Sequence, residues 1–425
     1  MNEPISVLRF QLTEAQIVGW VSVPLLLLGF FSARSFVLVL PLLVLVLVAA
    51  AVSFGRAGDT SPLAGLGRAD NYPIVTLALA FGFAAWGGLS ATWATLPAQS
   101  LLRSGALVLV AGFVVVPLIV LKSRPAAVVR NLSQSFALTY AVGASILFLD
   151  YATSGMLKSG HPDVAMRIGA VEFTRGATVL PVLLAPAIGC ALQVQDGRIR
   201  WGLTAFILLA GGAATILSPH DTAKLAFLAA VVTIGLTKLS VNWTRRLVTV
   251  GWLLACLTVV PIVAAVKHMG LDMATALPTS ATDRIVIWNE FAKLAAERPI
   301  VGHGANYTNT AKPNFKSTDE LSRRRTNAPE RARPIPLSHP HNVYLQVWVE
   351  LGAIGASLLA VFGLILIGSI SRLATRLQSI GYATFSAIAT QMTASYSLWQ
   401  YWFLSLLGLA VVIVAVANSA ATQRS

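Results

Sequence analysis

Long apolar stretches separated by short polar connections run along almost the whole chain. A helix needs about 20 mostly apolar residues to cross a membrane, and about twelve stretches have this length within a few residues. They are residues 15–31, 35–53, 73–94, 101–121, 132–150, 178–195, 201–217, 223–239, 247–266, 342–368, 381–397 and 400–418. The pattern therefore predicts an all-α integral membrane protein with about twelve transmembrane helices.

The composition agrees with a membrane protein and bears on its partners. Hydrophobic residues make up 56% of the chain and charged residues 11%, and the mean hydropathy is +0.73. A soluble domain with these values would expose large apolar patches. The net charge of +14 comes mainly from short loops and one polar block, so we expect membrane lipids and phosphates as partners and no nucleic acid.

Lysine and arginine in short loops mark the cytoplasmic side of a membrane protein. Every second connection carries such residues, namely Lys122, Arg124 and Arg130, then Arg198 and Arg200, then Lys238, Arg245 and Arg246, then Arg372 and Arg376. Arg34 is the main exception to this alternation. With an even number of spans, both termini lie in the cytoplasm, and residues 151–177 and 267–341 face outward.

The chain accordingly divides into three parts. Residues 1–266 form a scaffold of nine transmembrane helices with the outer segment 151–177, residues 267–341 form a polar block, and residues 342–425 carry the last three helices. The polar block is a large outer loop, and apolar residues at helical spacing in 283–297 predict an amphipathic helix on the membrane surface. The N-terminus lacks the features of a cleavable signal peptide, so we expect the first apolar stretch to be retained.

His341 directly precedes the apolar stretch that begins at residue 342. The positive end of a helix disfavours a protonated imidazole, so a neutral histidine able to accept a proton is expected near pH 7. The alternative is that Ser338 or Asn342 caps the helix and that His341 is an interfacial polar residue. His339 is open to the same two interpretations, and His339 and Asn342 are also candidate substrate ligands.

Arg284 opens the predicted surface helix, where its charge opposes the helix dipole. Binding of an anion would explain its position, whereas an ion pair with Glu290 or contact with a lipid phosphate are the alternatives. Arg175 and Lys224, with His220 close by, come out on the same outer face. Three cations and one possible base on one face indicate a site for a diphosphate and a hydroxyl nucleophile.

Several classes of site have no support in the sequence. There is no Walker loop, no HExxH motif and no paired carboxylates that would hold a sugar-nucleotide metal, so we expect no metal ion and no cofactor. Cys190 and Cys256 are far apart in apolar stretches and predict no disulfide. Acidic residues are almost absent from the predicted spans, which argues against a proton-coupled transporter.

Three stretches resemble, in order, the signature elements of the O-antigen ligase and polymerase superfamily. They are Ala91 to Trp93 with Pro97 and Ser100, then Arg284 to Trp288 followed by Pro299, Gly302 and Gly304, then His341 and Asn342 through Glu350 to Gly352 and Gly355. Together they span most of the chain.

The resemblance implies a metal-independent glycosyltransferase of the bacterial inner membrane that takes a glycan from undecaprenyl diphosphate at the periplasmic face. His341 would be the general base, and Arg284 would bind the diphosphate. Many relatives have Ser-Arg after the span at 201–217, where this chain has Ser218 followed by proline. A second cation for the diphosphate is therefore open between Lys224 and Arg175.

Ligase, polymerase and protein O-glycosylating enzymes share this architecture. The position of the last span near the end of the chain and the basic stretch from Lys316 to Arg333 favour the ligase, which would transfer O-antigen to a sugar hydroxyl of lipid A-core with inversion. The alternatives are an O-antigen polymerase and a flippase or transporter of lipid-linked glycan, which would need the cations but no base.

Overall fold

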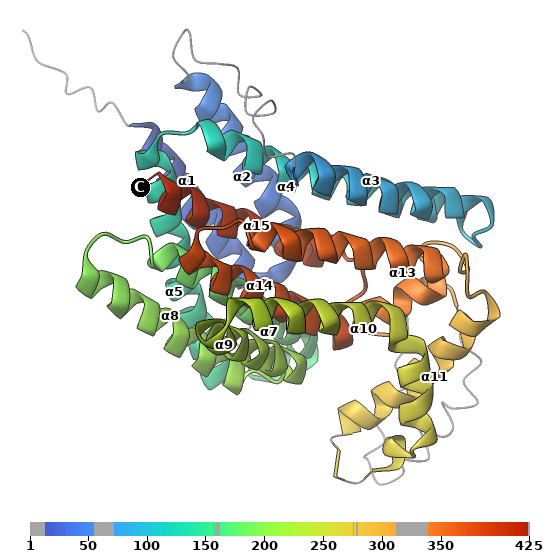
Figure 1. The fold of residues 1–425 in the computed structure, drawn as a ribbon. Helices are drawn as coiled ribbons and strands as arrows, with labels where there is room; N and C mark the ends of the chain where they lie inside the picture. Colours follow the sequence, from blue (N-terminus) through green and yellow to red (C-terminus); the bar gives the residue numbers. More distant parts are fainter. Residues whose placement is uncertain are drawn as a thin grey trace, which may run out of the picture.

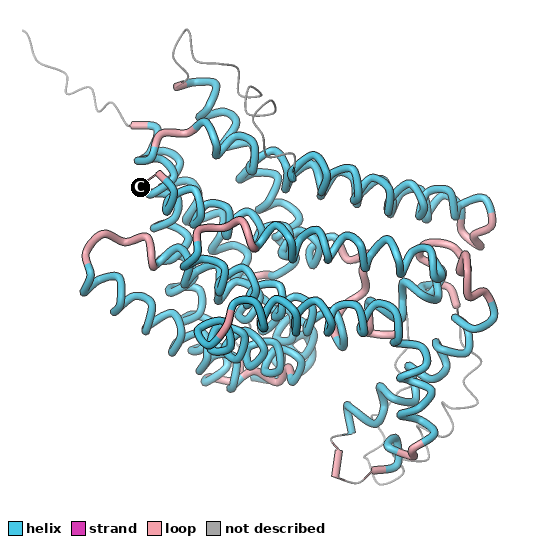
Figure 2. Tube along the Cα trace, viewed as in Figure 1, coloured by secondary structure: helices cyan, strands magenta, loops and turns pink. Residues whose placement is uncertain are grey.

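The computed structural model describes residues 13–54, 72–155, 157, 162–274, 276–277, 279–311 and 339–423. Regular structure in these ranges is entirely helical (Figure 2). The helices before the polar block are α1 Glu14–Phe31, α2 Phe36–Ser53, α3 Tyr72–Leu89, α4 Pro97–Val120, α5 Ala126–Ala152, α7 Pro162–Ala191, α8 Gly197–Leu217, α9 Asp221–Leu239 and α10 Val241–His268. The later ones are α11 Thr279–Glu297, α13 Val343–Ile370, α14 Thr375–Ala394 and α15 Tyr401–Thr422. The predicted all-α membrane fold is confirmed.

Eleven helices in the described part of the chain are long and apolar enough to cross a membrane, one fewer than the sequence predicts. The helix that falls short is α14, which carries several Thr, Ser and Gln side chains. It packs against α9 and α7 inside the bundle (Figure 1). A helix surrounded by other helices can keep polar side chains because they find partners in the protein.

The long helices lie alongside one another around a buried centre (Figure 1). Neighbouring pairs are α1 with α5, α9 with α14, α3 with α4, and α10 with α13. The centre is the last part of α7, where 89% of the residues of Thr174–Ala191 are buried, together with α15, which packs on α7, α4 and α5. The C-terminus and α11 lie at opposite ends of the bundle.

The predicted outer helix is present as α11. Its apolar residues Ile285, Phe291 and Ala295 are buried, and the helix packs on α10 and α13. Its contact with a membrane surface stays a prediction. Ser338 and the predicted basic loop from Lys316 to Arg333 lie outside the described residues.

Candidate active site

His341 lies in a short segment that is held on both sides. After it, the side-chain oxygen of Asn342 accepts a hydrogen bond from the N–H of Leu345 (3.0 Å) and caps α13. Before it, the Pro340 carbonyl accepts a hydrogen bond from the indole N–H of Trp288 on α11 (2.9 Å). His341 has a φ of 55°, a left-handed conformation that costs a residue of this kind about 1–3 kcal/mol. Asn342 is therefore the helix cap, and it acts on the site by fixing the residue before it.

The ring of His341 has a defined orientation and tautomer. Its Nδ1 lies 2.8 Å from the Ser395 carbonyl oxygen, and a carbonyl can only accept. The neutral ring therefore carries its proton on Nδ1 and presents a lone pair at Nε2. Burial lowers the pKa of His341 and the charge of Arg284 lowers it further, against the opposite effect of the Ser395 carbonyl. His341 is thus neutral and able to accept a proton at Nε2 near pH 7.

His339 packs against the ring of His341 and holds this segment in place. Its Nδ1 accepts a hydrogen bond from the backbone N–H of His341 (3.1 Å), and the two ring centres are 4.2 Å apart. Burial, and then the charge of His341, lower the pKa of His339 to about 3. His339 is therefore a neutral ring with its proton on Nε2, which makes it a hydrogen-bond donor and not the base.

Arg284, His220 and Lys224 gather near His341. His220 caps α9, because its Nδ1 accepts a hydrogen bond from the N–H of Ala223 (3.0 Å). Burial lowers the pKa of His220 to about 4, and the charges of Arg284, His341 and Lys224 act in the same direction, so these groups lie within electrostatic reach of one another. Asp221 opposes this effect on His220.

Arg284 is a partly buried cation at this site. Burial lowers the pKa of its guanidinium, and the carboxylate of Asp221 acts in the opposite direction. Glu290, the alternative partner considered for Arg284, forms its ion pair with Lys293 (2.7 Å). Lys224 pairs with Asp221 at 3.3 Å, and both side chains are exposed.

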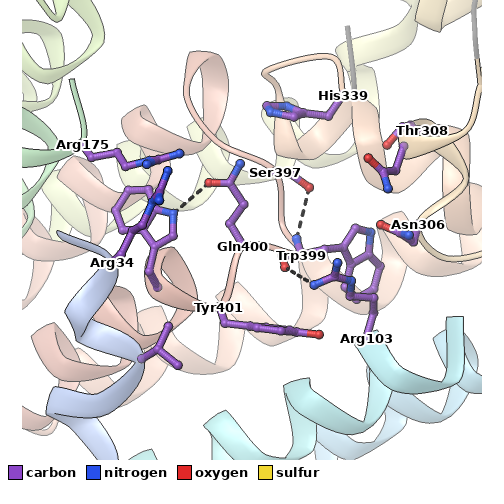
Figure 3. A pocket seen from close by; sticks show the side chains of 13 residues that line it. Arg34, Arg103, Arg175, Asn306, Thr308, His339, Ser397, Trp399, Gln400 and Tyr401 are labelled. Carbon is purple, nitrogen blue, oxygen red and sulfur yellow. Dashed lines mark hydrogen bonds between the residues drawn. The ribbon is translucent and has the colours of Figure 1, made fainter. Parts of the chain in front are cut away.

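Arg175 lines a cavity of about 410 Å³ together with His339 (Figure 3). Arg284, His220 and Lys224 are not among the residues that line this cavity. Arg284 acts electrostatically on His341, and Lys224 on His220.

Two glycine-containing stretches that are far apart in the sequence form one contact. Helix α13 is broken at Gly352, with φ 65° and ψ −164°, and the stretch that starts at Pro299 docks against this break. The N–H of Ala353 donates to the Pro299 carbonyl (2.8 Å), and the N–H of Gly304 donates to the Glu350 carbonyl (2.8 Å). A Cβ at Gly352 would lie 2.3 Å from a backbone oxygen of the docked stretch. Glycine is required because only it combines positive φ with so close an approach.

The carboxylate of Glu350 holds the surrounding segments together. It is 1% exposed and accepts hydrogen bonds from the N–H of Asn306 (2.9 Å), the N–H (3.2 Å) and hydroxyl of Thr308, the amide of Gln346 (3.1 Å) and the indole N–H of Trp399. It joins the outer segment, α13 and the connection between α14 and α15. That connection also contains Ser395, which orients His341.

Known proteins are similar to parts of this chain. Residues 204–360 match the family model described as O-antigen ligase. A protein of Rickettsia conorii named "Putative polysaccharide ligase" is 27% identical over 280 residues, which cover 63% of each chain. A protein of Rickettsia bellii with the same description is 26% identical over 348 residues, covering 79% of this chain and 78% of the relative. Over residues 204–360 the chain is thus similar to the O-antigen ligase family.

This similarity supports an O-antigen ligase- or polymerase-type function on a multi-pass membrane protein. The stretch matched by the family model contains His220, Lys224, Arg284, His341 and the buried Glu350. Arg175 and the described helices from α1 to α7 lie outside it.

Sequence reasoning missed the residues that organise the site. Ser395 could not be found because it acts through its backbone carbonyl. Glu350 carried a usable signal, since a carboxylate inside a membrane span is rare and needs partners. Among the described residues, no group of three or more His, Cys, Asp or Glu could hold a metal ion.

Proposed function

We propose that the chain is a glycosyltransferase of the ligase type in the bacterial inner membrane. It moves O-antigen glycan from undecaprenyl diphosphate to a sugar hydroxyl of lipid A-core at the periplasmic face. The observation that carries the proposal is the orientation of His341, whose Nδ1–H is fixed by the Ser395 carbonyl and whose Nε2 is left as the acceptor. A protein that only binds or moves the lipid needs cations but no base held in this way.

The reaction is a single displacement. The acceptor hydroxyl attacks the anomeric carbon of the lipid-linked glycan, its proton passes to Nε2 of His341, and the bond from the anomeric carbon to the diphosphate oxygen breaks. One displacement inverts the anomeric centre. General base catalysis of this kind contributes about 10²- to 10⁴-fold in rate.

Undecaprenyl diphosphate leaves with the bonding electrons and so gains negative charge. Arg284 stabilises that charge, helped by Lys224 or Arg175. A cation fixed in a partly buried site contributes about 10²- to 10³-fold when the charge develops in the transition state. Because cationic side chains do this work, the proposed chemistry requires no metal ion.

The test is a transfer assay with purified protein, undecaprenyl-diphosphate-linked glycan and rough lipopolysaccharide in the presence of chelator. His341→Asn tolerates the positive φ and keeps a donor for the Ser395 carbonyl but removes the base. Arg284→Gln removes the cation. The control is His303→Asn, because His303 is also a buried histidine, bonded to the Leu294 carbonyl (2.9 Å).

We expect transfer by the wild type in chelator, a loss of about 10²-fold or more for the His341 and Arg284 variants, and transfer close to wild type for the control. Extension of the carrier-linked glycan, in place of transfer to lipopolysaccharide, would identify a polymerase. Full transfer by His341→Asn would refute the general-base assignment, and lipid translocation without bond cleavage would favour the transporter.

A further inference from the structure

A cavity of about 410 Å³ opens beside His339 (Figure 3). Three arginines from different parts of the bundle line it, namely Arg34 from the connection between α1 and α2, Arg103 from α4 and Arg175 from α7. None of the described residues that line it is acidic. A cavity that collects arginines without carboxylates favours an anionic occupant.

Asn306 adds a hydrogen-bond donor to this cavity. Its side chain is 5% exposed, and its Nδ2 has no hydrogen-bond partner among the described residues. Its backbone N–H is bound to the Glu350 carboxylate (2.9 Å), so the residue is held in place. A buried amide without a protein partner costs about 1–3 kcal/mol, and a ligand oxygen in the cavity would remove that cost.

Arg103 is held in place, and one of its guanidinium nitrogens has no hydrogen-bond partner among the described residues. Its Nη1 donates to the Trp399 carbonyl (3.3 Å), and its guanidinium carbon lies 4.9 Å from the centre of the Tyr401 ring. Its Nε is buried and makes no hydrogen bond to a described residue. Two fixed residues from separate segments, each with one unsatisfied buried donor, therefore line one cavity.

One residue that lines the cavity also contacts the proposed base. His339 lines it, carries its proton on Nε2 and contacts the ring of His341. The cavity is thus a cationic site whose lining does not include Arg284.

We propose that this cavity binds a phosphate or diphosphate group carried by one of the two lipid-linked substrates, with Arg103 and Asn306 as ligands that the sequence analysis did not single out. The proposal rests on the proposed function for the identity of those substrates. Its chemistry is that of an oxyanion held by guanidinium and amide donors, and it is the same whether the group belongs to the glycan donor or to the acceptor.

The experiment separates binding from transfer. Binding of undecaprenyl diphosphate to the full-length protein in detergent is measured by calorimetry, with undecaprenol as the uncharged control probe. Arg103→Gln removes a charge from the cavity. Asn306→Gly removes only the unpaired amide, because glycine accepts the φ of 64° and keeps the N–H bound to Glu350.

The control variant is Arg200→Gln, since Arg200 also lies over an aromatic ring, that of Trp201 at 5.9 Å, but on α8 and outside the cavity. The melting temperature of each variant shows whether it is folded. The KM for rough lipopolysaccharide, intact and enzymatically dephosphorylated, is measured in the transfer assay.

If the cavity holds the donor's diphosphate, Arg103→Gln raises the Kd for undecaprenyl diphosphate by at least about tenfold and Asn306→Gly raises it severalfold, with no change for undecaprenol or Arg200→Gln. If it holds an acceptor phosphate, the Kd is unchanged, the KM for intact lipopolysaccharide rises by a similar factor, and dephosphorylated lipopolysaccharide shows no such rise. Variants that are folded and match the wild type in both Kd and KM would overturn the proposal. A wild type that binds but does not transfer would refute the proposed function alone, because the Kd comparison does not depend on turnover.

Discussion

Glu350→Gln is the sharpest test of how the site is held together. Both carboxylate oxygens accept at least two donors, with Asn306 and Trp399 on one and Thr308 and Gln346 on the other. A glutamine of the same shape loses least when its NH₂ group lies against Thr308 and Gln346, because Gln346 also donates to the Ser397 hydroxyl (2.9 Å). The buried N–H of Thr308 then loses its acceptor, which costs about 1–3 kcal/mol, so we expect a destabilisation of about 1–3 kcal/mol.

The two cysteines allow this loss of stability to be measured as a change in melting temperature. Cys190 and Cys256 are both buried, so a fluorogenic maleimide reacts with them as the protein unfolds on heating. For a chain of this length about 1 kcal/mol corresponds to about 1 °C, and the melting temperature of Glu350→Gln should fall by about 1–3 °C. The control is Glu290→Gln, an acid paired with Lys293 in a largely exposed ion pair that contributes little. A Glu350→Gln protein that melts with the wild type would refute the account of the network.

Three further predictions concern the backbone, pH and a surface cation. Gly352→Ala should destabilise the protein by at least about 2 kcal/mol, because the new Cβ meets backbone at 2.3 Å. The control Gly368→Ala, on the same helix, meets no atom within 4 Å and should melt at or slightly above the wild-type temperature. Equal melting temperatures of the two variants would contradict the docking of the Pro299 stretch against Gly352. Because burial and Arg284 lower the pKa of His341, the transfer rate should fall at acid pH with a midpoint below the ordinary histidine value of about 6.5. In Arg284→Gln the midpoint for the residual rate should move to higher pH, and a midpoint above pH 7 in the wild type would exclude this base. Lys224→Gln should change the melting temperature by less than about 1 °C, since the ion pair of Lys224 with Asp221 is exposed. A raised KM for the glycan donor in that variant would therefore indicate that Lys224 binds the diphosphate, and an unchanged KM would exclude Lys224 from the site.

The helices could be predicted because each is encoded locally. The ends of α9 and α13 agree with their predicted spans to within about two residues, since length and hydropathy decide a span without reference to other segments. Length and hydropathy do not describe α14, because this helix is surrounded by other helices. Its polar side chains are accommodated by those neighbouring helices, and a local stretch of sequence does not reveal them.

The candidate site was predictable only where a residue type carries its own chemistry. His341 and Arg284 stood out because an imidazole and a guanidinium at helix ends need an explanation, and the structure brings them within electrostatic reach of each other. Arg103 carried the same kind of signal as Glu350, because an arginine inside a predicted span is rare, but its relation to Asn306 depends on the fold. That Arg175 lines the cavity and Arg284 does not likewise depends on tertiary structure.

The group that orients His341 belongs to the main chain. Every amino acid at position 395 would offer the same carbonyl, so substitutions there leave the tautomer of His341 intact unless they move the backbone. A serine-protease histidine, by contrast, loses its orientation when one aspartate is replaced. The carbonyl is also uncharged and stabilises a protonated ring less than a carboxylate would, so the base that we propose is weaker and releases its proton more readily. In the proposed mechanism, tolerance of substitutions at position 395 and fast release of the proton come from the same hydrogen bond.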